Sequence, residues 1–219
     1  TADFKSFTKD NIQEGYDFLE SLKAPYVLKA DGLAAGKGVV ILDSLKEAKA
    51  SLFDFLNGKF GEASETVVIE EYLHGKELSV FIATDGISYK LLPAAKDYKR
   101  VGEGDKGPNT GGMGAVSPVN YADDDLMRKV EDKVIKPTLA GLKNENIEYT
   151  GFLYFGLMKV DDEPYVIEYN VRLGDPETQA VLPRVECDFI DLFKAMANKS
   201  LSDLEVSISP LSASTVILA

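Results

Sequence analysis

The sequence has little of two residue types that often carry chemistry or cross-link a fold: one cysteine and one histidine in 219 residues. A single cysteine excludes an internal disulfide and is typical of a reducing compartment. We interpret Cys187 as a small core residue rather than a reactive thiol. A single histidine excludes a histidine-based catalytic triad and a histidine-rich zinc site within this chain. His74 lies beside a glycine between two expected strands, and we interpret it as a solvated loop residue.

Long apolar runs and an excess of positive charge are also missing. No segment approaches the roughly 18 apolar residues of a membrane span, and the N-terminus has no signal-peptide pattern. The 24 basic and 36 acidic residues give a formal net charge of −12, which argues against nucleic acid or an anionic membrane as a partner. With 45% hydrophobic residues, the chain can bury a substantial core in one or two lobes. We expect a cytoplasmic monomer.

The spacing of the apolar residues predicts short strands interspersed with helices. Expected helices cover residues 12–19, 45–56, 123–142 and 188–199, with a kink at Pro137. Expected strands cover residues 26–30, 39–42, 66–69, 78–83, 152–160 and 165–171. Residues 161–164 have the composition of a hairpin turn. This mixture predicts an α+β fold with largely antiparallel sheets.

A glycine-rich, charged segment is the most informative part of the chain. Residues 91–100 run on to residues 108–114, and we expect this stretch to be a loop. Its glycines let backbone N–H groups approach a ligand closely. Its Lys, Arg and Asn side chains are donors suited to phosphate and carboxylate. Together with residues 29–38, 70–77 and 168–177, this segment favours a nucleotide- and metal-dependent enzyme over a binding or structural role.

Two glycine motifs look like nucleotide-binding fingerprints but fail the tests for them. Residues 32–38 are one residue short of a P-loop, and Gly38 follows Lys37 where a Ser or Thr is required. What remains is a flexible glycine loop that can fold over a polyphosphate, with an ordinary mobile hairpin as the alternative. Residues 102–107 match a dinucleotide fingerprint, but no parallel strand and helix bracket them, so we reject this match.

Acidic residues near two strand ends suggest metal and nucleotide contacts. Glu168 and Asn170 lie two residues apart on an expected strand, so their side-chain oxygens share a face. This pair suits Mg²⁺, which shares oxygen ligands with substrate phosphates, and a polar sheet face is the alternative. Residues 70–73 end another strand, where free backbone groups can read an adenine edge, and Glu77 can accept hydrogen bonds from ribose. Simple solvation of these acidic residues is the alternative there.

Three long motifs carry a specific resemblance. Residues 28–39, 108–115 and 168–179 resemble the phosphoribosylamine–glycine ligase (glycinamide ribonucleotide synthetase) family, ATP-grasp enzymes of de novo purine synthesis. The resemblance covers nearly the whole chain in the right order. It implies an ATP-grasp fold with two lobes of largely antiparallel sheet and helices, and the nucleotide bound between the lobes. The implied domains are a small flap lobe over 1–72, a core lobe with the metal and substrate site over 73–197, and the start of a truncated C-terminal domain over 198–219.

The resemblance also implies an activity. ATP phosphorylates the glycine carboxylate, and the amine of 5-phosphoribosylamine attacks the glycyl phosphate to give glycinamide ribonucleotide, ADP and phosphate. The implied cofactors are ATP and Mg²⁺ or Mn²⁺, and the partners are these two small-molecule substrates. One alternative is another ATP-grasp carboxylate–amine ligase, against which residues 109–114 argue. The other is a nucleotide-binding module without catalysis, which the intact pair Glu168 and Asn170 disfavours.

Roles for individual residues follow from the resemblance alone. The implied ATP contacts are Lys29, Gly32, Gly36, Lys37, Gly38, Glu70, Glu71, Leu73 and Glu77. The implied catalytic residues are Asp97, Lys99 and Arg172. The implied substrate contacts are Arg100, Asn109, Thr110, Gly111, Gly112, Met113 and Asp175. The implied metal ligands are Glu168 and Asn170.

The chain departs from the family pattern at three points. Gly156 stands where many ATP-grasp enzymes have another acidic metal ligand, which this family can do without. Leu173 stands where an aromatic residue is expected, a conservative packing change. The family's N-terminal domain and an upstream phosphate-binding lysine have no counterpart here, because Lys5 and Lys9 lie too close to Lys29. We therefore expect a piece of a larger protein, weakly active or inactive by itself.

Overall fold

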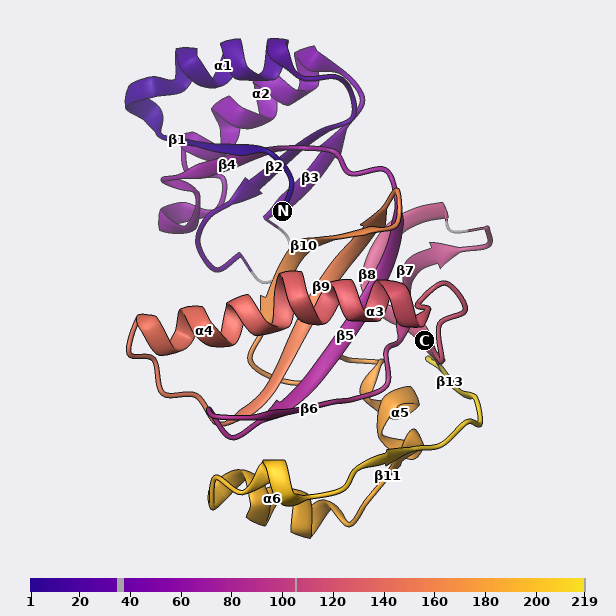
Figure 1. Cartoon of the computed structure of the whole chain (residues 1–219). Helices are drawn as coiled ribbons and strands as arrows, with labels where there is room; N and C mark the ends of the chain where they lie inside the picture. Colours follow the sequence, from indigo (N-terminus) through magenta and orange to yellow (C-terminus); the bar gives the residue numbers. More distant parts are fainter. Residues whose placement is uncertain (35–37, 105, 219) are drawn as a thin grey trace. The chain divides into compact units, whose positions relative to one another are not determined.

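The chain divides into two compact units, Thr1–His74 and Gly75–Ala219, which Figure 1 shows in a computed structural model. The structure describes residues 1–34, 38–104 and 106–218. Every strand pairing between the named strands of this described part is antiparallel, and helices accompany the sheets in each unit, so the α+β expectation is confirmed. None of the described helices is long and apolar enough to cross a membrane.

The first unit is a four-stranded sheet with two helices packed on one face. Its strands, in sheet order, are β1 (Phe4–Phe7), β4 (Val67–Glu71), β2 (Tyr26–Ala30) and β3 (Val39–Leu42). Helices α1 (Ile12–Ser21) and α2 (Leu45–Leu56) pack on the sheet through a cluster that includes Leu28, Leu52 and Phe55. The Ser44 hydroxyl accepts the Glu47 N–H at 3.4 Å and caps α2, as the sequence predicts.

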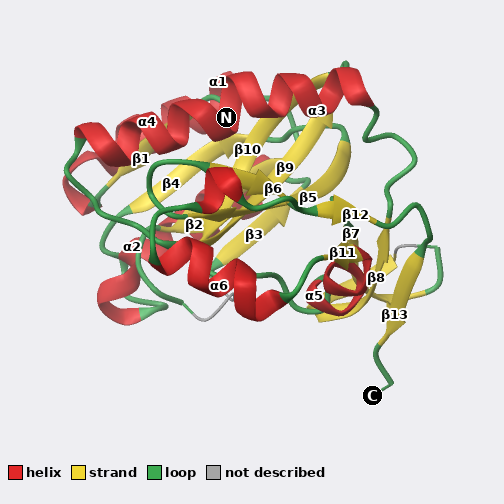
Figure 2. Cartoon of the chain, turned by 60° about the horizontal axis from the view of Figure 1, so that its bottom comes forward, coloured by secondary structure: helices red, strands yellow, loops and turns green. Residues whose placement is uncertain are grey.

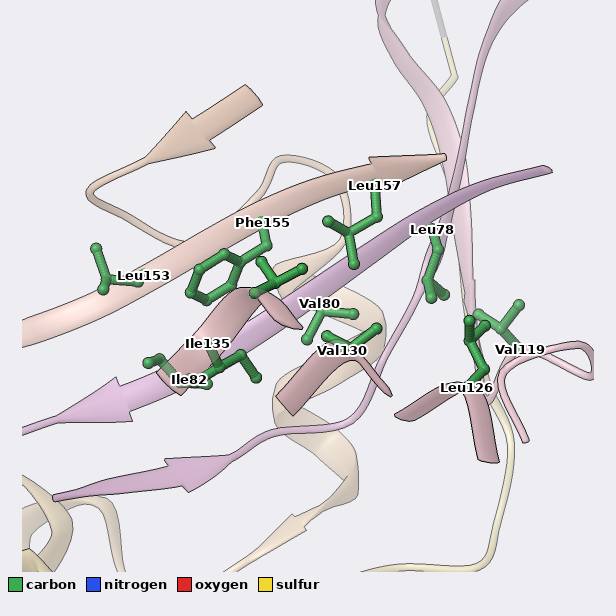
Figure 3. Packing of buried hydrophobic residues seen from close by; sticks show 11 residues of the cluster. Leu78, Val80, Ile82, Val119, Leu126, Val130, Ile135, Leu153, Phe155 and Leu157 are labelled. Carbon is green, nitrogen blue, oxygen red and sulfur yellow. The ribbon is translucent and has the colours of Figure 1, made fainter. Parts of the chain in front are cut away.

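The second unit is built on a sheet that is covered on both faces. Its strands, in sheet order, are β10 (Glu163–Asn170), β9 (Gly151–Val160), β5 (Lys76–Thr84) and β6 (Tyr89–Leu91). Helices α3 (Asp124–Val130) and α4 (Lys136–Asn144) cover one face, and α5 (Thr178–Val181) and α6 (Phe189–Ala197) lie on the other (Figure 2). Figure 3 shows Val80, Phe155 and Val130 meeting under α3. The sheet is therefore the rigid centre of this unit.

The long helix of the second unit continues through its proline. A π-helical turn, Glu131–Ile135, separates α3 from α4 and comes immediately before Pro137. Proline lacks the N–H that an α-helical bond to the Lys133 carbonyl would need. The kink expected at Pro137 stays a prediction.

The glycine-rich segment is a β-hairpin, so the expectation of a loop over residues 91–114 is wrong. Strands β7 (Lys96–Gly102) and β8 (Lys106–Ser117) form it, and β13 (Ala213–Val216) adds to β8. A side chain on Gly112, at φ +128°, would collide with the Pro176 ring, and one on Gly114 would collide with the Thr215 carbonyl. These glycines therefore reflect close neighbours rather than a loop. Antiparallel strands bracket residues 102–107, which confirms the rejection of the dinucleotide fingerprint.

Two further features complete the second unit. Asp161 and Asp162 join β9 to β10 with φ values of +47° and +63°, as in a type I′ turn, so the expected hairpin is confirmed. Strand β11 (Val185–Glu186) pairs with β12 (Ser207–Ile208). Short 3₁₀ turns lie in the first unit at Lys9–Asn11 and Gly61–Ser64, and in the second unit at Leu182–Arg184 and Leu201–Asp203. The expected domain boundaries near residues 72 and 197 stay predictions.

Candidate active site

A β-bulge decides which way the expected metal ligands point. Val166 of β10 lies opposite Leu157 of β9, whereas Glu168 lies opposite Gly156, so Ile167 is an extra residue in β10. Side chains alternate along a strand, and one extra residue reverses the faces beyond it. Val166 therefore packs on the core beneath α3 and α4. Glu168 points to the opposite face.

Part of that opposite face carries polar side chains, and we call this part the polar face. Phe81 and Ala83, on the rest of it, pack in apolar clusters. The register places Glu168 beside Gly156 and Ser79, and places Asn170 beside Tyr154. The Ser79 hydroxyl lies 3.3 Å from the Tyr154 hydroxyl. A Cβ on Gly156 would lie 2.8 Å from Glu168 Cγ and 3.2 Å from Tyr154 Cε1. The absence of a side chain at this position therefore makes room for the Glu168 side chain.

Strand β7 brings a lysine and a buried carboxylate to this face. Lys99 Nζ lies 3.6 Å from Asp97 Oδ2 and 3.9 Å from Glu77 Oε2. Asp97 is buried, and among the described residues its Oδ1 has no hydrogen-bond partner. Burial raises the pKa of Asp97 to about 6, since the lowering by Lys99 is opposed by the charges of Glu177 and Glu77. Such an unsatisfied buried oxygen costs stability and is typical of a functional site.

Acidic side chains surround Lys99 as well. Burial lowers the pKa of the Lys99 amine, but Glu77, Tyr154, Asp97 and Glu168 together raise it above its ordinary value. The lysine is therefore held protonated. Burial also raises the pKa of Tyr154 to about 12, so its hydroxyl keeps its proton at neutral pH.

The donor set fits a divalent cation bound through few protein ligands. Glu168 is exposed and Asn170 half-buried, and a carboxylate with an amide oxygen is what Mg²⁺ takes in proteins. Within the described ranges, no group of three or more His, Cys, Asp or Glu side chains is placed to hold a metal by itself. Any ion at Glu168 and Asn170 would therefore complete its shell with ligand or water oxygens.

Two of the sequence motifs meet beside the polar face. Gly112 of β8 lies against Pro176, which follows Asp175. The Thr110 hydroxyl donates to the Lys99 carbonyl at 2.7 Å and accepts the Gly112 N–H at 3.1 Å. The structure thus brings the expected substrate contacts of residues 110–112 next to the 172–177 loop and to the strand that carries Lys99.

The remaining expected substrate residues are exposed or bonded locally. Arg172 is exposed and donates to the Leu173 carbonyl at 2.9 Å. Asp175 is exposed and accepts the Gln179 amide at 3.2 Å. The Met113 carbonyl accepts the Ile217 N–H at 2.9 Å. Gly111 has open space where a side chain would be, Arg100 is exposed, and the side chain of Asn109 lies outside the described part of the structure.

In the first unit, the expected ATP contacts lie on the sheet and at its ends. Lys29 Nζ forms an ion pair with Glu70 Oε2 at 2.7 Å, on the sheet face away from the helices. Glu71 Oε1 accepts the Asp3 N–H at 3.2 Å, and Leu73 is half-buried. The Gly32 N–H donates to a carbonyl at 2.9 Å, and the Gly38 carbonyl accepts an N–H at 2.8 Å. Gly36 and Lys37 lie outside the described residues.

The two residues set aside from the sequence alone occupy ordinary positions. His74 is exposed, and its ring meets the Tyr72 ring edge-to-face at a centroid distance of 4.7 Å. Cys187 is half-buried and packs against the clusters beneath α5 and α6, and burial raises the pKa of its thiol. Both interpretations made from the sequence agree with these positions.

The sequence does not single out Ser79, Tyr154 or Glu177. Ser79 donates to Glu177 Oε1 at 2.9 Å although 98 residues separate them. Local sequence patterns cannot predict a contact between residues so far apart in the chain. Tyr154 could have been found, because it stands two residues before Gly156 on the same strand and therefore shares its face.

This arrangement of sheets, helices and charged face defines the chain as an ATP-grasp protein. At the level of fold alone, L-amino acid ligase from Bacillus licheniformis matches with a TM-score of 0.62 and 18% identity, over 100% of this chain and 49% of that chain. The model of the phosphoribosylglycinamide synthetase ATP-grasp (A) domain matches residues 1–178. The chain belongs to this family, so the resemblance read from the three motifs is confirmed.

Relatives in this family are similar along nearly the whole chain. Phosphoribosylamine–glycine ligase of Chlorobaculum tepidum is 48% identical over 204 residues, which are 92% of this chain and 48% of that protein. The enzyme of that name from Clostridium acetobutylicum is 44% identical over 94% of this chain and 49% of its own length. The crystal structure of phosphoribosylamine–glycine ligase from Thermotoga maritima matches with a TM-score of 0.84 and 39% identity, over 100% of this chain and 55% of that chain. The chain spans about half the length of the curated relatives it matches.

Proposed function

We propose that this chain is the ATP-grasp part of a phosphoribosylamine–glycine ligase. The observation that carries the proposal is the polar face, where Asp97 and Lys99 of β7 lie close to Glu168 and Asn170 of β10. ATP phosphorylates the glycine carboxylate and leaves as ADP. The amine of 5-phosphoribosylamine then forms the C–N bond and displaces phosphate, giving glycinamide ribonucleotide. The names of the similar enzymes support the same reaction.

The first unit supplies ATP contacts in this proposal. Lys29 provides positive charge for the phosphates, and Gly32, Gly36, Lys37 and Gly38 are further proposed ATP contacts. Exposed apolar side chains of the sheet, Phe4, Val39 and Ile41, share a face with Lys29 and offer a surface for a flat base. The remaining proposed ATP contacts are Glu70, Glu71 and Leu73 of the first unit and Glu77 of the second.

Glu168 and Asn170 would hold Mg²⁺ or Mn²⁺, because their oxygens are the donors that hard cations take. The ion supplies charge neutralisation at the phosphate oxygens when it is bound. Gly156 keeps the space beside Glu168 open, so the carboxylate can adopt the position that the ion requires.

The chain's own residues provide positioning and charge rather than a nucleophile. Lys99 and Arg172 are the cations proposed to face the transferred phosphoryl group. Asp97 is the carboxylate proposed to accept the proton that the amine loses as the C–N bond forms. The proposed contacts to glycine and the sugar phosphate are Arg100, Asn109, Thr110, Gly111, Gly112, Met113 and Asp175.

The wider context is part of the same proposal. Residues 1–72 act as the flap lobe, residues 73–197 as the core lobe, and residues 198–219 open a further domain. We place the protein in the cytoplasm as a monomer, a location that suits a chain with one cysteine.

Trapping the acyl phosphate tests this proposal. The complete protein that carries this chain is incubated with Mg²⁺-ATP, glycine and hydroxylamine, and glycine hydroxamate and ADP are measured. Equal amounts of both, dependent on glycine, are expected, because hydroxylamine can replace the sugar amine as nucleophile. Hydroxamate formed only with another carboxylic acid would show a different carboxylate–amine ligase. ATP binding without ADP formation for any acid would show a non-catalytic module, and either result would overturn the proposal.

A further inference from the structure

The carboxylate of Glu177 is buried in the second unit, with 2% of the residue exposed. It accepts the Ser79 hydroxyl at 2.9 Å. A Cβ added to Gly174 would collide with this carboxylate, so the 172–177 loop is folded around it. Burying a charge is costly unless it is hydrogen-bonded. The stability of the 172–177 loop therefore does not by itself explain a buried carboxylate at Glu177.

Ser79 connects this carboxylate to the polar face. Its backbone exchanges two hydrogen bonds of 2.9 Å with Ala95, just before the strand that carries Asp97. Its hydroxyl lies 3.3 Å from the Tyr154 hydroxyl. One serine thus joins the 172–177 loop, strand β5 and the entry to strand β7.

Glu177 also acts on Asp97 through its charge. Lys99 of β7 favours the ionised form of Asp97, while Glu177 and Glu77 of β5 disfavour it. The Asp97 Oδ1 atom remains buried without a partner beside them. Tyr154 of β9 and Glu168 of β10 act on the same Lys99. The buried carboxylate thus sits where it can influence both the geometry and the charge of the proposed site.

We propose that Glu177 is a positioning residue, which fixes the 172–177 loop against strand β5 through Ser79 and keeps a second negative charge beside Asp97. This role rests on the proposed function, because the loop carries Arg172 and Asp175. Substrate is not touched by Glu177 itself. It sets where the exposed loop residues stand relative to Asp97 and Lys99, and it adjusts the proton affinity of Asp97.

The charge is tested without catalysis, by following the Asp97 carboxyl carbon in an NMR titration of the 219-residue chain. Glu177→Gln keeps an oxygen acceptor for Ser79 and removes the charge, so the Asp97 midpoint should fall by about 0.5 to 1 pH unit. The matched control is Glu186→Gln, an exposed glutamate of β11, which should leave the midpoint at the wild-type value. An unchanged midpoint in Glu177→Gln would overturn the proposal.

The mechanical link is tested in the hydroxylamine assay. Ser79→Ala keeps the charge of Glu177 and removes its tie to β5, so kcat should fall by about tenfold while the KM for ATP stays within about twofold. The control is Ser209→Ala, another buried serine of the second unit. A wild-type kcat in Ser79→Ala would contradict the proposal. If wild-type protein forms no glycine hydroxamate, the proposed function fails, and the NMR titration still decides whether the charge of Glu177 acts on Asp97.

Discussion

Both units consist of antiparallel strands and helices, but their sheets are covered differently. The sheet of the first unit has helices on one face and exposes Phe4, Val39 and Ile41 on the other, around the ion pair of Lys29 and Glu70. The sheet of the second unit is covered on both faces. Its buried carboxylates, Asp97 and Glu177, are therefore shielded from water, and charge interactions are stronger there.

The difference also shows in how the charges are satisfied. In the first unit, Lys29 and Glu70 neutralise each other at 2.7 Å. In the second unit, Asp97 has a buried oxygen without a partner, and its lysine is 3.6 Å away. A fold optimised only for stability would satisfy that oxygen. We infer that Lys29 and Glu70 of the first unit form an ion pair when no ligand is bound. The charge of Asp97 in the second unit is not neutralised in this way.

The largest expected effect comes from the doubly covered sheet. Phe155→Ala should destabilise the chain by about 3–5 kcal/mol, because the ring is fully buried beneath α3. Ile41→Ala, on the open face of the first sheet, should cost less than about 1 kcal/mol, since the side chain is half exposed. Urea unfolding followed by circular dichroism measures both. Equal losses would show that the two sheets are not buried differently.

The next effect concerns the proposed metal ligands. Glu168→Gln should weaken Mn²⁺ binding in the presence of ATP by about 10- to 100-fold, because a charged oxygen ligand is lost. Isothermal calorimetry of Mn²⁺ into the ATP-saturated chain measures this. Glu186→Gln is the control. An unchanged Mn²⁺ affinity in Glu168→Gln would show that Glu168 is not a metal ligand, and would favour a non-catalytic module.

A smaller effect is expected in the first unit. Lys29→Met should lower ATP affinity by about tenfold, since the phosphates lose one cation. The loss of its ion pair should change the free energy of unfolding by only about 0–1 kcal/mol, because both side chains are partly exposed. Lys46→Met, a substitution on the surface of α2, is the control for calorimetry with ATP. A wild-type ATP affinity in Lys29→Met would mean that Lys29 does not leave its ion pair with Glu70 to bind the nucleotide.

The smallest expected effect is on Tm, and it tests whether the unpaired charge of Asp97 destabilises the fold. The pKa of Asp97 is raised from 3.8 to about 6 in the folded chain, so its ionised form destabilises the fold above pH 6. This cost disappears as the pH falls through 6 toward 3.8. Asp97→Asn should therefore raise Tm by a few degrees at pH 8 and leave it nearly unchanged at pH 4, at the expense of activity. Differential scanning calorimetry at both pH values measures this, and a lower Tm at pH 8 would show that Asp97 is stabilised when charged.

Much of the fold could be predicted because its signals are local. The strands 26–30 and 39–42 and the helix 45–56 have the predicted bounds, since their apolar periods and caps depend on neighbours in sequence. The hairpin of β7 and β8 could not be predicted in the same way. Its glycines are explained by Pro176 and Thr215, which approach from distant parts of the chain.

The candidate site, too, was predicted from the sequence only in part. The sequence by itself determined the family, through three long motifs, and with it the residue types Lys29, Asp97, Lys99 and Glu168. Only the tertiary structure decided where they point. The bulge at Ile167 turns Glu168 toward the polar face, and Ser79 reaches Glu177 across 98 residues. Side-chain direction depends on strand register and on partners distant in sequence, and neither is a property of the local chain.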